Sequence, residues 1–188
     1  IDANSRVLDL AAGPGSLALE LATRTPHVTM MELSRGFVGA ARAEAKRRGV
    51  PLAQRLAKVL EEERPGVQTG MLDITLYRDD PRQATFSPDF GKTSLPNELK
   101  GSLVILVDDV LYTGRTIRAA IDALFEYGRP ARIELAVLVD LGGRELPIQP
   151  DYCGLKQPLG KESYLRVRLR EQDGQDGLFL VDNKHDAS

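Results

Sequence analysis

A run of four apolar residues, Val104–Val107, is followed at once by two acids, Asp108 and Asp109. A short continuous run of β-branched and aliphatic residues is typical of a strand that is buried on both faces, as the strands of parallel sheets are. Beyond a polar turn, apolar residues recur at helical spacing, and they are Ile117, Ala120, Ile121 and Leu124. The pattern predicts a buried strand ending in two carboxylates, then a turn at the N-terminus of a helix.

Buried strands and amphipathic helices alternate along most of the chain. Strands are predicted at residues 6–10, 28–33, 69–76 and 132–140. Apolar residues at helical spacing predict helices over residues 17–22, 37–45 and 52–60. This alternation predicts an α/β fold with a mostly parallel, doubly wound, Rossmann-like sheet.

The C-terminal region predicts a hairpin. Residues Tyr164–Arg170 alternate between apolar and basic, as a half-exposed strand does. A turn at Asp173 and Gly174 then leads to the apolar run Leu178–Val181. The arginines of the first strand could face the phosphate backbone of a nucleic acid, but such a row is more often a solvated face, and we favour that interpretation. They are Arg166, Arg168 and Arg170.

Composition and charge narrow the function classes. The 188 residues are 42% hydrophobic and 28% charged, which is ordinary for a soluble globular protein, and the formal charge of −2 gives no general attraction to nucleic acid or membrane. Cys153 is the only cysteine and the two histidines lie far apart, so no disulfide is possible and no metal site is predicted. No apolar run reaches the roughly 20 residues of a membrane span, and a cytoplasmic location is expected. Because the first residue is Ile rather than Met, we expect the chain to begin inside a longer or engineered one.

The turn Thr113–Thr116 combines hydroxyls, a glycine and backbone N–H groups at a predicted helix N-terminus, where oriented amides favour a phosphate. Beside it, two carboxylates suit a ligand that carries both a phosphate and polyol hydroxyls. The alternative is a generic strand–turn–helix with two solvated acids. The stretch resembles the phosphoribosyl-pyrophosphate (PRPP) signature of type I phosphoribosyltransferases. That resemblance implies that Asp108 and Asp109 hold the ribose, and that the 5′-phosphate is held by Thr113, Gly114, Arg115 and Thr116.

From about residue 48 to residue 181 the chain resembles one group of that family, the bacterial uracil phosphoribosyltransferases that double as pyrimidine-operon attenuators. The matching runs are Arg48–Ala53, Asp73–Asp80 and Asp140–Ile148. The resemblance implies a phosphoribosyltransferase-like sheet with a small hood, and a loop from Tyr77 to about Leu95 that closes over PRPP.

The same resemblance implies roles for particular residues. The catalytic residues would be Asp108, Asp109 and Arg78, with Arg78 near the pyrophosphate. Arg48 and Gly49 would also contact the pyrophosphate of PRPP. Asp140 and Arg144 would belong to the hood over the base. For Arg78, the alternative is a surface loop whose charges are merely solvated.

The first 47 residues instead resemble the N-terminal half of S-adenosylmethionine-dependent methyltransferases. A strand, a glycine turn, a helix and a second strand ending in an acid would make a Rossmann-type half. The residues that match the cofactor-binding motifs of those enzymes are Asp9, Gly13, Gly15 and Glu32. The resemblance implies S-adenosylmethionine binding. The alternative, favoured as far as catalysis is concerned, is a tight structural turn with a solvated Glu32.

The resemblance changes near Arg47, and this change divides the chain into residues 1–47 and 48–188. We expect a chimera of two α/β fragments whose strands join in one continuous sheet. The phosphoribosyltransferase family has an apolar strand before its pyrophosphate loop, where this chain has the helix-like residues 40–46. Either Val7–Leu10 or Val28–Leu33 fills that sheet position, or the loop is displaced. If Val28–Leu33 fills it, Ser34–Gly36 becomes a rival pyrophosphate loop.

The resemblance to the uracil phosphoribosyltransferases implies an enzyme that joins uracil to PRPP and releases pyrophosphate, with Mg²⁺ carried mainly by the substrate. A chimera that binds PRPP or S-adenosylmethionine without turnover is the alternative, and a methyltransferase is a weaker one. Leu141–Gly143 replaces the Arg-Gly-His of many attenuators, and Gln157–Gly160 replaces a Val-Pro-Thr-type run. These changes leave base affinity open and argue against RNA attenuation. A homo-oligomer, a dimer, is expected, with no membrane partner.

Overall fold

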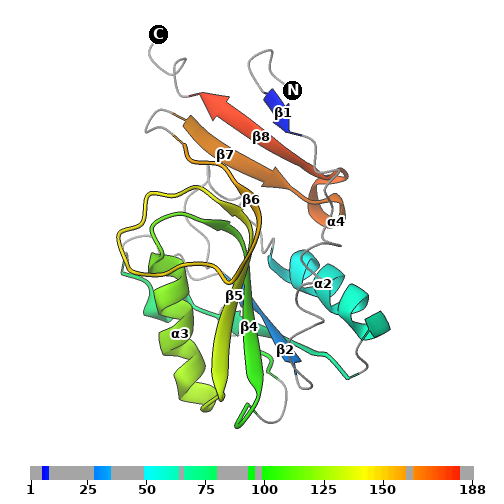
Figure 1. Cartoon of the computed structure of the whole chain (residues 1–188), viewed down its shortest axis with the longest axis vertical. Coiled ribbons are helices and arrows are strands. Elements are labelled where there is room, and N and C mark those ends of the chain that lie inside the picture. The colour runs from blue at the N-terminus through cyan, green and yellow to red at the C-terminus, as the bar shows by residue number, and fades with distance from the viewer. Residues whose placement is uncertain are drawn as a thin grey trace.

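A computed structural model describes residues 6–8, 28–34, 49–63, 66–79, 93–95, 99–159 and 163–182. Within these ranges the strands form a five-stranded sheet and a three-stranded sheet. Figure 1 shows the smaller sheet above the larger one, with helices α2 and α3 on either side of the larger sheet. No helix in this described part is long and apolar enough to cross a membrane.

The larger sheet is parallel throughout, which confirms the predicted α/β class. Its spatial order is β3-β2-β4-β5-β6, and every neighbouring pair runs parallel. The strands are β2 (Val28–Ser34), β3 (Gln68–Asp73), β4 (Leu103–Leu111), β5 (Arg132–Asp140) and β6 (Tyr152–Lys156). Since the strands are parallel, their carboxyl ends share one edge, where ligands bind in such sheets.

The central strand β4 is buried on both faces, as its apolar run predicts. Ile105 and Val107 pack in one core cluster with the apolar side of α2 (Gly49–Glu63). Val104 and Leu106 pack in a second cluster with α3 (Arg115–Tyr127). The period of two along the strand therefore gives each helix its own face of the sheet.

Helix α2 begins earlier than the sequence pattern indicates. The apolar spacing predicts a helix over residues 52–60, but Gly49 is already the first residue of α2. Pro51 then lies within the first turn, where its missing N–H costs no intrahelical hydrogen bond and is therefore tolerated. The helix that the sequence predicts ahead of residue 49 lies outside the described ranges.

The strand beside β4 is β2, which answers the question raised by the N-terminal region. Val28 pairs with Leu103 and Glu32 with Val107, so Val28–Leu33 fills the sheet position that the phosphoribosyltransferase pattern requires. The first of the two possible strands, β1 (Arg6–Leu8), pairs antiparallel with β8 (Gly177–Asp182) in the smaller sheet. The prediction of a Rossmann-type half is therefore wrong, because β1 and β2 belong to different sheets. A strand of three residues can cover the edge of a hairpin, which an unpaired β8 would leave open.

The smaller sheet, here called the hood, contains the predicted C-terminal hairpin. Strand β7 (Ser163–Arg168) pairs antiparallel with β8, and a short helix, α4 (Arg170–Asp173), lies between them. Val167, Leu169 and Leu178 join the core cluster of α2, so the hood packs on the larger sheet through that helix.

An arginine on α2 adds a polar link between the hood and the larger sheet. Arg55 donates to Glu171 at 2.8 and 2.6 Å and to Asp176 at 2.7 Å. The hydrogen bond from Arg55 lowers the pKa of Glu171, outweighing partial burial. For Asp176, burial acts in the opposite direction, but the hydrogen bonds from Arg55 and from the Arg170 amide prevail and lower its pKa.

Candidate functional site

The two predicted ribose acids lie in the last part of β4 and differ in their surroundings. Asp108 is only 2% exposed, whereas Asp109 is half-buried. The Asp109 amide donates to Asp108 Oδ1 at 3.0 Å. A buried carboxylate needs such a donor, so Asp108 has a structural bond in addition to any role with a ligand.

The turn after β4 has the geometry expected of an anion-binding segment. Gly114 is left-handed, with φ 91°, and precedes the first residue of α3, Arg115. The first helical backbone bond runs from Arg118 N to Gly114 O at 3.0 Å. The N–H groups of the residues between them, at the helix N-terminus, therefore have no carbonyl of the helix to donate to. Such amides, together with the hydroxyls of Thr113 and Thr116, can hold a phosphate.

The loop that follows β5 is bonded directly to this turn. Leu141 N donates to Leu111 O at 2.9 Å, and the amides of Glu145 and Leu146 both donate to Thr113 O, at 3.0 and 3.2 Å. Side-chain atoms of Leu146 and Ile148 lie 3.4–3.5 Å from where a Cβ on Gly114 would be. The loops after two neighbouring strands, β4 and β5, thus form one continuous structure at the carboxyl edge of the sheet.

Asp140 and Arg144 were predicted for a hood over the base, but they lie at the end of β5 and in the loop after it, outside the smaller sheet. There they pair with each other. Arg144 Nη2 lies 2.7 Å from Asp140 Oδ2. The same guanidinium donates to the carbonyls of Ile148 at 2.8 Å, Tyr112 at 2.7 Å and Gly142 at 3.1 Å. Burial raises the pKa of Asp140, but the Gly142 amide and the Arg144 guanidinium outweigh burial and hold that pKa below its ordinary value. Arg144 therefore fixes the shape of the loop.

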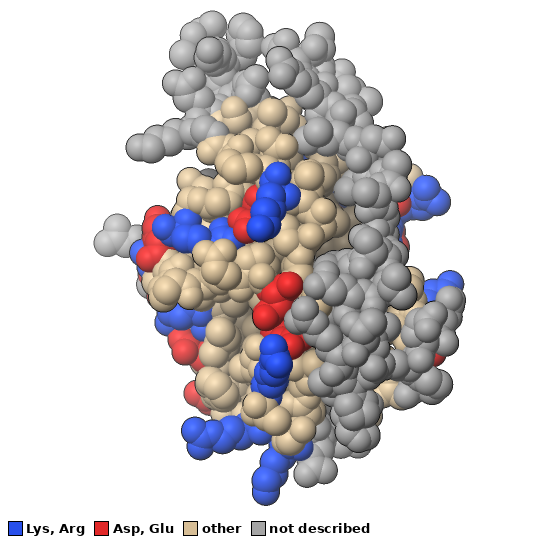
Figure 2. Space-filling view, in the orientation of Figure 1, with Lys and Arg blue, Asp and Glu red and all other residues tan. Residues whose placement is uncertain are grey.

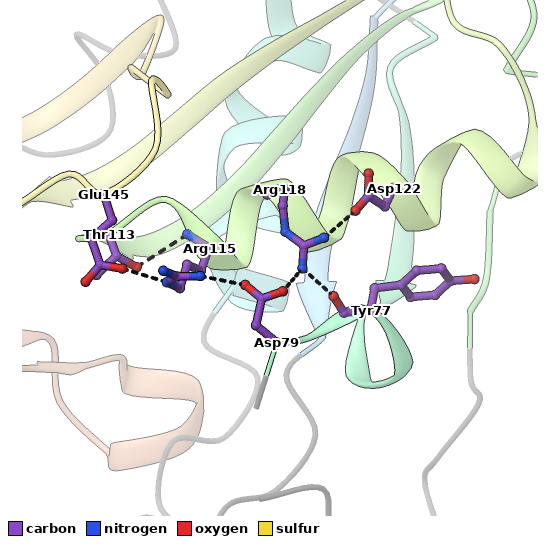
Figure 3. A network of polar contacts seen from close by, with 7 residues as sticks. All are labelled: Tyr77, Asp79, Thr113, Arg115, Arg118, Asp122 and Glu145. Atoms are coloured by element: carbon purple, nitrogen blue, oxygen red, sulfur yellow. Dashed lines mark hydrogen bonds and ion pairs between the residues drawn. The ribbon is translucent and has the colours of Figure 1, made fainter. Parts of the chain in front are cut away.

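The segment after β3 brings Arg78 to the same edge. It begins with a 3-10 turn, η1 (Thr75–Tyr77), and the Asp73 carboxylate accepts from Thr75 N at 2.9 Å and from Thr75 Oγ1 at 2.6 Å. Asp79, next to Arg78, pairs with both Arg115 and Arg118 (Figure 3). Of this segment, only Arg78 was predicted to belong to the site. Residues 80–92, most of the predicted closing loop, lie outside the described ranges.

Both ends of that loop are anchored at β3. Ser94 and Met71 exchange backbone hydrogen bonds of 2.7 and 2.8 Å, and Asp73 N donates to Thr93 Oγ1 at 3.1 Å. The chain therefore leaves β3 at its carboxyl end and returns to lie antiparallel beside it.

Several predicted site residues cannot be compared with the structure. Arg48, Asp9, Gly13, Gly15 and residues 35 and 36 of the rival loop lie outside the described ranges. For Glu32 the structure gives only the backbone, which is paired with Met71 and Val107 inside the parallel sheet. Gly49 is at the N-terminus of α2.

Four residues at this edge were missed by the sequence analysis as contributors to the site. Glu145 accepts from Arg115 Nε at 2.6 Å, and Arg118 donates to Tyr77 O at 2.9 Å. The ring of Tyr112 lies against Gly143, where an added Cβ would be 2.3 Å from Cε2. The only sequence signal for them is their position within the family-like runs, since the contacts join residues 30 or more positions apart. The four are Asp79, Tyr112, Arg118 and Glu145.

Comparison with known proteins identifies the family. Residues 45–163 match the phosphoribosyl transferase domain. Two relatives are each named "Bifunctional protein PyrR". The protein of Roseiflexus sp. (strain RS-1) is 51% identical over 161 residues, covering 85% of this chain and 87% of that protein. The protein of Thermus aquaticus is 48% identical over 152 residues, covering 80% and 84%. Among solved structures, the HGPRT-ase of Leishmania tarentolae in complex with GMP has a TM-score of 0.60 at 17% identity, covering 98% of this chain and 100% of that one.

The chain therefore belongs to the phosphoribosyl transferase domain family, and it has the α/β fold of the type I phosphoribosyltransferases. Within it, the relatives with about half of their residues identical are the bifunctional PyrR proteins. These comparisons give no support to a methyltransferase half, to S-adenosylmethionine binding or to a chimera. A match of 161 residues cannot be contained in residues 48–188 and so reaches into the first 47.

Proposed function

We propose that the chain is a uracil phosphoribosyltransferase, which joins uracil to PRPP and releases pyrophosphate. The support is the family, the PyrR relatives at about 50% identity, and the arrangement at the carboxyl edge of the sheet. One observation carries the proposal above the others. A left-handed Gly114 opens α3 a few residues after the two acids of the central strand, so groups suited to a phosphate and groups suited to ribose hydroxyls lie close together in the chain.

The proposed division of labour follows the two loops. The amides and hydroxyls of Thr113–Thr116 hold the 5′-phosphate, while Asp108 and Asp109 accept hydrogen bonds from the ribose hydroxyls. Arg78, together with Arg48 and Gly49, contacts the departing pyrophosphate. The loop that Arg144 fixes through Asp140 borders the base. Positive charge develops on the ribose as pyrophosphate leaves, so positioning and electrostatic stabilisation carry the reaction, without a covalent enzyme intermediate.

The donor set also fits Mg²⁺, which takes carboxylate and hydroxyl oxygens and usually binds with substrate phosphates through one or two protein carboxylates. Asp109, with Asp108 beside it, offers that number of carboxylates at the end of β4. The ion would come with PRPP and would neutralise part of the charge on its pyrophosphate.

The test is the double variant Asp108→Asn with Asp109→Asn. Both changes keep the size of the side chain and remove the charge that would accept from the ribose. Each lost hydrogen bond to a charged group is worth about 1.5–3 kcal/mol, so PRPP affinity should fall by more than about tenfold in calorimetry with Mg²⁺. Product formation from labelled uracil should fall with it.

Glu126→Gln is the matched control, because Glu126 is an exposed acid at the far end of α3. It should bind PRPP as the unaltered chain does. Unchanged PRPP affinity in a folded double variant, checked by circular dichroism, would remove the ribose assignment and with it the proposed function.

A second function is regulation through RNA. The relatives are named bifunctional, and the chain resembles the uracil phosphoribosyltransferases that double as pyrimidine-operon attenuators. The changes at residues 141–143 and 157–160 were expected to argue against RNA attenuation, and the similarity to the PyrR proteins does not support that expectation. Figure 2 shows Lys and Arg interspersed with Asp and Glu on the face it draws, so an RNA site would depend on local groups. Arg168 lies 4.9 Å from the Phe179 ring centroid on the hood, and Arg166 lies on the same strand. Salt-dependent binding of a pyrimidine-operon leader RNA, weakened by Arg166→Gln, is the measurement that checks it.

A further inference from the structure

Asp79 lies between two arginines of the first turns of α3 (Figure 3). Its Oδ2 is 3.0 Å from Arg115 Nη1, and its Oδ1 accepts from Arg118 Nη2. Each arginine has a further acidic partner, since Arg115 Nε donates to Glu145 at 2.6 Å and Arg118 Nη1 donates to Asp122 at 2.7 Å. One carboxylate thus joins two cations that are themselves held in place.

These contacts connect three segments that follow three different strands. Asp79 belongs to the segment after β3 and Glu145 to the loop after β5. Arg115 belongs to Thr113–Thr116, the segment after β4 that is proposed to hold the 5′-phosphate and is here called the phosphate turn. Parallel strands place their carboxyl ends on one edge of the sheet, but β3 and β4 are separated there by β2. Backbone pairing cannot join the β3 segment to the phosphate turn, so side chains make the connection.

Arg118 holds the backbone of the β3 segment as well as its carboxylate. Its Nη2 donates to Tyr77 O at 2.9 Å, two residues before Asp79. The Nε atom of Arg118 is buried and has no hydrogen-bond partner among the residues that the structure describes. The guanidinium of Arg118 donates to Tyr77, Asp79 and Asp122. Because Tyr77 and Asp79 are the residues before and after Arg78, Arg118 holds both neighbours of Arg78 against α3.

We propose that Asp79 is a positioning residue that sets Arg78 relative to the phosphate turn through Arg115 and Arg118. The inference rests on the proposed function, because it takes Arg78 as the residue that contacts the pyrophosphate of PRPP. Asp79 itself touches no substrate. Its carboxylate is occupied by the two arginines, and it acts by holding the backbone of its neighbour at a fixed distance from the amides of Thr113–Thr116.

The network has the character of a positioning device rather than of a source of stability. The side chains of Asp79, Arg115 and Arg118 are 39%, 51% and 36% exposed. Ion pairs at such exposure are screened by solvent and contribute little to the free energy of unfolding. Their geometric effect remains, because two arginines anchored to α3 restrict where a carboxylate between them can lie. Loss of Asp79 should therefore change ligand affinity much more than the melting temperature.

The experiment compares Asp79→Asn, Arg78→Ala and the double variant by calorimetry with PRPP and Mg²⁺. Asp79→Asn keeps the shape of the side chain and should weaken PRPP binding by about tenfold, the size of one charge-assisted hydrogen bond lost at the pyrophosphate. The melting temperature should stay within a few degrees of that of the unaltered chain. In the Arg78→Ala background, the same change should weaken binding by less than about twofold, because Asp79 acts through Arg78.

Glu126→Gln is the matched control, since Glu126 is an exposed acid of the same helix that takes part in none of these contacts. Its PRPP affinity should equal that of the unaltered chain. Asp79→Glu retains the charge and should recover most of the binding that Asp79→Asn loses, which a merely structural role for the loop would not require.

Two results would overturn the proposal. Unchanged PRPP affinity in folded Asp79→Asn would do so, and so would equal effects of Asp79→Asn with and without Arg78. Either could occur while the Asp108 and Asp109 double variant still loses PRPP, in which case the proposed function stands without this refinement. If the double variant at Asp108 and Asp109 binds PRPP normally, the proposed function itself fails.

Discussion

Two arginines at the carboxyl edge of the sheet have opposite surroundings: Arg144 lies in the loop after β5, and Arg115 is the first residue of α3. The Arg144 side chain is 14% exposed and donates to three backbone carbonyls in addition to pairing with Asp140. The Arg115 side chain is 51% exposed and pairs only with acidic side chains among the contacts described above. Arg144 is part of the interior of one loop, whereas Arg115 connects acidic side chains of two separate segments.

The difference indicates why the two residues should respond differently to mutation. A buried guanidinium satisfies groups that have no access to water, so its removal leaves carbonyls and a carboxylate unpaired. An exposed guanidinium can be replaced by water and ions at its partners, so its removal changes geometry more than stability. The resemblance to a family groups both arginines with ligand-binding segments and cannot separate these roles.

The largest expected effect is that of Arg144→Ala. Removing one partner of a buried ion pair typically costs about 3–5 kcal/mol, because the other charge stays buried and unpaired. We therefore expect the free energy of unfolding, measured by urea denaturation, to fall by about that amount.

Arg115→Ala is the matched comparison, and it should lower the free energy of unfolding much less while weakening PRPP binding. Equal losses of stability in the two variants would mean that burial does not distinguish the arginines, and the comparison would have to be abandoned.

Much of the fold follows from periodicity alone. The strand Arg132–Asp140 has the predicted bounds, and β4 contains the predicted run Val104–Val107. Such strands are apolar on both faces, so the sequence alone predicts their burial in a parallel sheet. The C-terminal hairpin is also predicted by alternation, although the helix α4 between its strands is not.

The errors arise where pairing, rather than local pattern, decides the outcome. Residues 6–10 and 28–33 both have strand character, and nothing within three or seven residues tells which sheet each one joins. Strand β1 pairs with β8, more than 160 positions away in the chain, and that contact depends on an edge only the folded hood provides. Asp79 and Glu145 were missed for the same reason, since their partner Arg115 lies 36 and 30 positions away.

A smaller effect is expected from adding a methyl group at Gly143. Both Gly142 and Gly143 have left-handed backbones, with φ of 70° and 66°. A Cβ on Gly142 would meet nothing within 4 Å, whereas one on Gly143 would lie 2.3 Å from the Tyr112 ring. Gly142→Ala thus carries only the backbone strain, and Gly143→Ala must also displace the ring. Overpacking typically costs about 1–3 kcal/mol, and because Tyr112 is half exposed we expect the lower end of that range.

Urea denaturation of the two alanine variants gives this difference directly. Tyr112→Ala in the Gly143→Ala background should remove it, because no ring then has to move. If Gly142→Ala is as destabilising as Gly143→Ala, backbone strain accounts for both, and the ring does not determine the spacing of the two loops.

The smallest effect concerns the stability of the protein in acid. It tests the buried ion pair of Arg144 with Asp140 without removing the arginine. Burial raises the pKa of Asp140, yet its hydrogen bond from Gly142 and its ion pair with Arg144 lower it below the ordinary value of 3.8. A group whose folded pKa is lowered stabilises the protein above the unfolded pKa, and this contribution is lost as pH falls through the folded pKa.

The free energy of unfolding should therefore drop between about pH 5 and pH 3 more steeply in the unaltered chain than in Asp140→Asn, which has no proton to take up. The difference between the two urea-denaturation curves isolates Asp140 from Glu171 and Asp176, whose pKa values are also lowered. Parallel curves across that pH range would show that Arg144 does not lower the free energy of the ionised carboxylate. The loop after β5 would then owe its shape to the three carbonyl contacts of Arg144 alone.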